Sequence, residues 1–204
     1  MAVAHAALAA GLIACGSSDD PDVSLDASGA ERDASAGAAD AAYDPSCFPD
    51  RDAVPGGQID VGRPAPFEAF LDNDDLTLVI GPQGGVHIDI QARMSGLVPG
   101  DPDNPVSEDN PYTRFFAYDQ DEVQVSAIPC AFRIAYTDDG EGLSLDHDVV
   151  LFLKNEHVAP ATAERRIGQT WRIGVEIVDA QGRYASDFHD VHVAEVAVSN
   201  PALH

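Results

Sequence analysis

The feature that most constrains the fold is an alternation of apolar side chains with a period of two, found throughout residues 55–204. In 76–80 and 86–90 every second residue is aliphatic, which is the pattern of a β-strand with one buried face. Residues 161–166 alone suggest a turn of helix. Further strand-like runs occur at 114–118, 123–128, 131–136, 143–145, 149–153, 171–178 and 191–198.

Turns rich in Gly and Asp separate these runs, at 81–85, 138–142 and 179–182. We expect Gly84 or Gly85 to adopt a positive φ in the first of them, because glycine has no Cβ to oppose it. Many short strands joined by such turns predict an all-β domain, most simply an antiparallel β-sandwich. A small β-barrel is the alternative.

Residues 171–182 (Trp-Arg-Ile-Gly-Val-Glu-Ile-Val-Asp-Ala-Gln-Gly) form the clearest predicted hairpin. This segment resembles the penultimate strand and turn of immunoglobulin-like and fibronectin-type domains. The resemblance implies an immunoglobulin-like sandwich, with an aromatic residue entering the strand and an Asp-x-x-Gly turn leaving it. Trp171 is accordingly expected in the core.

The first 14 residues contain no Asp, Glu, Lys or Arg and end in Leu12-Ile13-Ala14-Cys15. This ending resembles the lipobox of bacterial lipoproteins, which implies cleavage after Ala14 and a lipid on Cys15. The apolar run fits the h-region of a signal peptide and is too short to span a bilayer as a helix. No basic residue precedes Cys15, which leaves open a start codon upstream of Met1 or an Ala-rich helix packed on the domain.

The lipobox resemblance implies a protein attached to a membrane of the cell envelope through its lipid, and Gly16 after the cysteine favours the outer membrane. Residues 15–54 hold ten acidic side chains but hardly any bulky apolar ones. Such a segment can bury too little apolar surface to offset the conformational entropy lost on folding, so we expect a disordered acidic tether. A calcium-binding tail is the alternative. The domains predicted are therefore a signal peptide (1–14), an anchor and tether (15–54) and a β domain (55–204).

The chain is strongly acidic, with 35 acidic against 11 basic residues and a net charge of −24. Because phosphate backbones repel such a chain, nucleic-acid binding is excluded as a function. The same charge opposes binding to anionic lipid surfaces, so that any membrane attachment must come from something other than charge; the lipobox resemblance implies the lipid on Cys15.

If Cys15 carries a lipid, Cys47 and Cys130 are left as a pair. In an oxidising envelope we expect a disulfide between them. It would close a loop of about 80 residues, worth roughly 4 kcal/mol in the chain-entropy treatment. Two unpaired thiols are the alternative, and the lack of a Cys-x-x-Cys spacing argues against a redox role.

The sequence contains no nucleophile elbow, and Glu156-His157 lacks the first histidine of a His-Glu-x-x-His zinc motif. Two segments offer weak metal candidates. In 187–192, residues two apart share a strand face, so His189 and His192 diverge unless a bulge intervenes. The loop 100–111 has oxygen ligands but departs from the EF-hand spacing. The candidate ligands are Asp101, Asp103, Glu108, His189 and His192.

The function expected from these features is a non-enzymatic binding or structural module, lipid-anchored in the cell envelope and without a cofactor. A protein or a glycan is the expected partner. A calcium- or transition-metal-dependent module is one alternative, and an enzyme with an unrecognised site is another. The sequence leaves the oligomeric state open.

Overall fold

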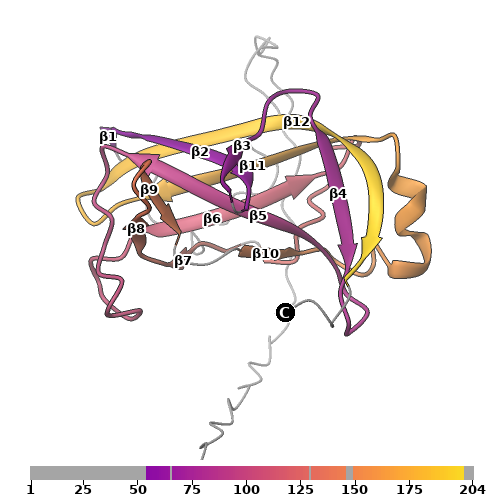
Figure 1. The fold of residues 1–204 in the computed structure, drawn as a ribbon, viewed down its shortest axis with the longest axis horizontal. Helices are drawn as coiled ribbons and strands as arrows, with labels where there is room; N and C mark the ends of the chain where they lie inside the picture. The colour runs from indigo at the N-terminus through magenta and orange to yellow at the C-terminus, as the bar shows by residue number, and fades with distance from the viewer. Residues whose placement is uncertain (1–53, 65, 129, 146–148, 200–204) are drawn as a thin grey trace, which may run out of the picture. The chain divides into compact units, whose positions relative to one another are not determined.

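A computed structural model describes residues 54–64, 66–128, 130–145 and 149–199 (Figure 1). The predicted signal peptide, the predicted lipidation site Cys15, Cys47 and the predicted tether up to residue 53 lie outside these residues, so the anchor and the Cys47–Cys130 disulfide stay predictions. Within the described ranges, no helix is long and apolar enough to cross a membrane.

The described residues form twelve strands and one short 3-10 helix, Pro160–Arg166. The strands are β1 (Val54–Pro55), β2 (Gln58–Arg63), β3 (Glu68–Ala69), β4 (Asp75–Ile80), β5 (Val86–Ser95), β6 (Tyr112–Tyr118), β7 (Phe132–Arg133), β8 (Tyr136–Asp138), β9 (Leu143–Leu145), β10 (Val149–Phe152), β11 (Thr170–Val178) and β12 (Arg183–Val198). The prediction of an all-β domain is therefore confirmed, with a single turn of helix where it was expected.

The strands belong to one sheet that curls into a half-barrel, with the main path β3-β2-β5-β4-β12-β11-β6-β7 (Figure 1). The sheet is mixed rather than purely antiparallel. The reason is the long strand β12, whose first part pairs antiparallel with β11. Its later part, from His192 to Val198, pairs parallel with β4 and has an irregularity between Val193 and Glu195, and its start pairs parallel with β1.

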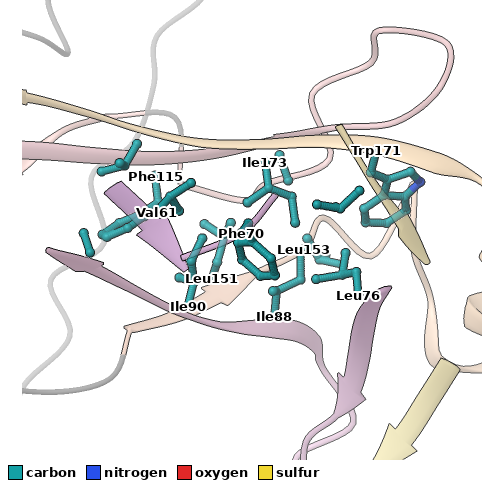
Figure 2. Packing of buried hydrophobic residues seen from close by; sticks show 14 of the residues in the cluster. Val61, Phe70, Leu76, Ile88, Ile90, Phe115, Leu151, Leu153, Trp171 and Ile173 are labelled. Carbon is teal, nitrogen blue, oxygen red and sulfur yellow. The ribbon is translucent and has the colours of Figure 1, made fainter. Parts of the chain in front are cut away.

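The core lies inside the curl of the sheet, where alternate residues of the strands meet (Figure 2). Trp171 is fully buried there, as predicted. Its neighbours in the same cluster include Phe70, Leu76, Ile88 and Ile173. Burying side chains of this size stabilises a domain by about 1.5–3 kcal/mol each.

Local predictions held at most positions. Gly84 has φ 80°, and the turn after β11 contains Gly182 with φ 72°. The predicted strand at 123–128 is instead a loop with two isolated bridges, at Gln124 and Ser126. The run 131–136 divides between β7 and β8, and β2 had no prediction because only Ile59 and Val61 alternate there.

Candidate functional site

Strand β11 has two faces of different chemistry. Its inward residues belong to the core cluster: Trp171, Ile173, Val175 and Ile177. Its outward residues are Thr170, Arg172, Gly174 and Glu176. The neighbouring strands β6 and β12 continue the outward face in register, with Phe116 and Phe188 on either side of Gly174.

This outward face of β6, β11 and β12 is hollowed into a pocket with a volume of about 360 Å³, which we call the platform pocket. Its aromatic side chains are Phe116, Tyr118, Tyr184 and Phe188. Its charged side chains are Arg114, Asp119, Glu122, Arg172, Glu176 and Asp190. A concave site with an apolar floor and a few polar groups is the usual form of a small-molecule site.

Gly174 makes room for the aromatic floor. A Cβ at this position would lie 2.3 Å from Cζ of Phe116 and 2.7 Å from the carbonyl oxygen of Asp187. The ring of Phe116 therefore lies across β11, and it meets Tyr118 edge-on with ring centroids 5.6 Å apart. Phe116 is buried, whereas Phe188 is 53% exposed and available to a ligand.

A buried ion pair holds one end of the floor in place. Arg114 Nε donates to Glu176 Oε2 over 2.8 Å, and a second nitrogen of Arg114 also donates to this oxygen. Tyr184 donates its hydroxyl to the other oxygen, Glu176 Oε1, over 3.1 Å. Because three donors converge on one buried carboxylate, the positions of these side chains are fixed before any ligand arrives.

A second ion pair lies at the more open part of the pocket. Arg172 binds Asp190 through two hydrogen bonds, of 2.9 Å and 3.1 Å, and its guanidinium lies 5.0 Å from the centre of the Phe188 ring. The hydrogen bond from Arg172 to Asp190 raises the pKa of Arg172, and the charges of Asp190 and Glu122 raise it further. The carboxylates near Arg172 thus favour its charged form.

The turn after β6 forms the rim of the pocket. Asp119 Oδ1 accepts hydrogen bonds from the backbone N–H groups of Asp121 and Val123, each of 3.0 Å. Asp119 Oδ2 lies 3.7 Å from Nη1 of Arg166. Glu122 in the same turn is exposed and has φ 60°, a left-handed conformation that residues other than glycine rarely adopt.

One contact at the pocket bears on catalysis. Thr170 Oγ1 lies 3.0 Å from Nδ1 of His192. A hydroxyl activated by histidine needs a third group that orients the imidazole. Among the described residues, no carboxylate lies within ion-pair distance of His192, so this contact lacks the arrangement of a catalytic triad.

The structure does not bring the predicted metal candidates together. His189 contacts Asp72 and Asp187, at 3.4 Å and 3.3 Å, whereas His192 turns to the platform side, as their spacing indicated. In the loop after β5, Asp101 Oδ1 accepts the backbone N–H of Asp103, and Glu108 is exposed. Nowhere in the described part of the chain do three His, Cys, Asp or Glu side chains form a possible metal site.

Sequence reasoning missed the platform pocket, although β6 carried a signal for it. In a strand with one solvated face, aromatic residues are expected on the buried side only. In β6 the inward residues Phe115 and Ala117 alternate with outward Arg114, Phe116 and Tyr118, so aromatic residues lie on both faces. Comparisons with protein-family models, curated proteins and solved structures found no match to this chain.

Proposed function

We propose that the β domain is a non-enzymatic binding module and that the platform pocket is its ligand site. The observation that carries the proposal is the aromatic floor of Phe116 and Phe188, enclosed by two ion pairs. An exposed aromatic residue on a sheet face is costly to hydrate and useful when a ligand covers it.

The pocket is also prepared for binding by its polar groups. Arg114 and Arg172 are each held by a carboxylate, so a ligand would meet donors that have already lost their rotational freedom. Preorganisation of this kind increases affinity because less entropy is lost on binding. The volume of about 360 Å³ suits a small molecule, one sugar unit or one side chain of a partner protein.

The lipobox Leu12-Ile13-Ala14-Cys15 supports the further proposal that this module is held at the cell envelope, with the outer membrane favoured. Residues 15–54 would then act as an acidic spacer between lipid and domain. Replacing Cys15 with Ser should move the protein from the membrane fraction to the soluble fraction. Membrane attachment that survives this change would contradict the anchor.

For the fold, we further propose an immunoglobulin-like β-sandwich. The hairpin of residues 171–182 supports this proposal.

The ligand site is tested by binding measurements on the full chain with three classes of probe: neutral saccharides, phenylalkyl amines and phenylalkyl carboxylates. We expect saturable binding of at least one class, detected by ligand-observed NMR. The Phe188→Ala variant should lose it. The matched control is Phe152→Ala, since Phe152 on β10 is similarly exposed, at 49% against 53%, and does not line the pocket. Binding that survives Phe188→Ala, or no binding of any class, would overturn the proposal.

A further inference from the structure

We infer that the platform pocket selects a positively charged ligand and that Glu122 is the residue that sets this selectivity. The ligand class is a small molecule or side chain that joins an apolar body to an ammonium or guanidinium group. The inference rests on the proposed function, because it assigns a ligand chemistry to the same site.

The first observation is that the chain contains two turns of the same construction. In the turn after β11, Asp179 donates its N–H to the carbonyl of Arg183, and Asp179 Oδ1 accepts from the N–H groups of Gln181 and Arg183. In the turn after β6, Asp119 donates to the carbonyl of Val123. There the carboxylate of Asp119 accepts from residues 121 and 123 in the same way.

The two turns differ at the position that requires a left-handed backbone. The turn after β11 has Gly182 there, with φ 72°, and the turn after β6 has Glu122, with φ 60°. Glycine adopts this conformation without strain, whereas a side chain with a Cβ is strained in it. Glu122 is therefore a poor choice for the turn itself, and residues held in such conformations concentrate at functional sites.

The second observation is where Glu122 lies. It lines the platform pocket, where carboxylates outnumber guanidinium groups by four to two. Glu176 and Asp190 are already paired with Arg114 and Arg172. Glu122 forms no ion pair with any residue in the described ranges; its charge acts on Arg172 from beyond ion-pair distance, and Arg172 is already paired with Asp190.

The third observation is that the aromatic floor suits the same ligand. A cation placed over the face of an aromatic ring is attracted by the negative charge density of that face. The floor already holds one such contact, since Arg172 lies over Phe188. The net charge of −24 on the chain adds a long-range attraction for cations and a repulsion for anions. An anionic ligand would meet the opposite conditions at every step of its approach.

The test uses three probes with one phenylpropyl body and different head groups: phenylpropylamine, phenylpropanol and phenylpropionate. We expect the amine to bind the full chain about tenfold more tightly than the alcohol, and the carboxylate to bind most weakly. In Glu122→Gln the advantage of the amine should fall by about fivefold, the size expected of one exposed charge pair. The affinity for the alcohol should not change.

The control variant is Glu164→Gln, which removes one exposed charge that does not line the pocket. It should leave the preference for the amine intact. Equal binding of all three probes at Phe188, or tighter binding of a competing neutral saccharide, would overturn the selectivity while leaving the pocket as a ligand site. A preference that survives Glu122→Gln would overturn the role of Glu122. Failure of every phenylpropyl probe and of the neutral saccharides to bind would instead contradict the proposed function.

Discussion

The inward and outward faces of β11 are built by different physical means. The inward side chains of Trp171, Ile173 and Ile177 are fully buried among other apolar residues, so their contribution follows the apolar area removed from water. The outward residues Arg172 and Glu176 act through hydrogen bonds of defined partner and direction. The inward face can therefore accept many apolar sequences, whereas the outward face depends on particular residues at particular positions, as a recognition surface does.

The largest expected effect is on the inward face. Replacing Trp171 with Ala should lower the free energy of unfolding by about 3–5 kcal/mol, because it empties the space of the largest fully buried side chain and removes the hydrogen bond to Gln169. Urea unfolding of the full chain measures this loss, with Trp171→Phe as the milder control. A loss below about 1 kcal/mol would mean that the core does not depend on this residue.

The next effect tests whether the outward face is also needed for folding. Glu176→Ala removes the carboxylate that accepts two hydrogen bonds from the buried Arg114 and should cost about 3 kcal/mol. The double variant Arg114→Met, Glu176→Leu should regain most of this stability, because an apolar pair of similar volume replaces a buried ion pair at little cost. Both variants should bind ligand more weakly than the original chain, because Arg114 and Glu176 line the platform pocket. A double variant that binds ligand as well as the original chain would contradict the claim that recognition depends on these particular residues of the outward face.

The inward face was open to sequence analysis, and the outward face was not. Alternation of apolar residues is a local signal, so β4, β6, β9, β10 and β11 were found at or near their true positions, β5 was found over its first half, and Trp171 was placed correctly in the core. The pocket depends on pairings between strands far apart in the chain, such as Arg114 with Glu176. Such pairings follow from the register of β6 on β11, which no local pattern contains.

The length of β12 was missed for a related reason. Only residues 191–198 show apolar alternation, since the earlier part of the strand carries Asp187, His189 and Asp190 on its two faces. Those polar residues are tolerated in a strand because they have partners. Asp187 accepts the N–H of Val61, and Asp190 pairs with Arg172. Tertiary contacts here override a composition that is unfavourable for a strand.

A smaller effect is the loss of stability at low pH that we expect from Asp179, in the turn between β11 and β12. Burial alone would raise the pKa of Asp179, but hydrogen bonds from the N–H groups of Val98 and Arg183 and from the Arg183 side chain outweigh it and lower the pKa. A carboxyl group with a lowered folded-state pKa stabilises the fold above its unfolded pKa of about 3.9. This contribution is lost as the pH falls through the folded-state value.

The measurement for Asp179 is the free energy of urea unfolding between pH 6 and pH 2, compared with that of Asp179→Asn. At neutral pH the variant should be the less stable by about 1.5–3 kcal/mol, the usual worth of hydrogen bonds to a charged group. The difference should shrink as the pH falls below about 4, because the original side chain then also loses its charge. A difference that stays constant down to pH 2 would assign the stabilisation to shape rather than to charge.

The smallest effect is a gain in the free energy of unfolding. It separates most clearly the contribution of the outward face to stability from its contribution to ligand recognition. Glu122→Gly relieves the left-handed backbone of the turn after β6 and should raise the free energy of unfolding by about 1 kcal/mol. The reverse exchange, Gly182→Glu, should lower it by a similar amount, since the two turns share their hydrogen bonds and a Cβ at Gly182 meets no neighbour within 4 Å. If Glu122 is kept for recognition, the more stable Glu122→Gly variant is also the one that loses selectivity for phenylpropylamine, while Gly182→Glu keeps it. A Glu122→Gly variant that is both more stable and equally selective would leave the strained residue without a function in the pocket.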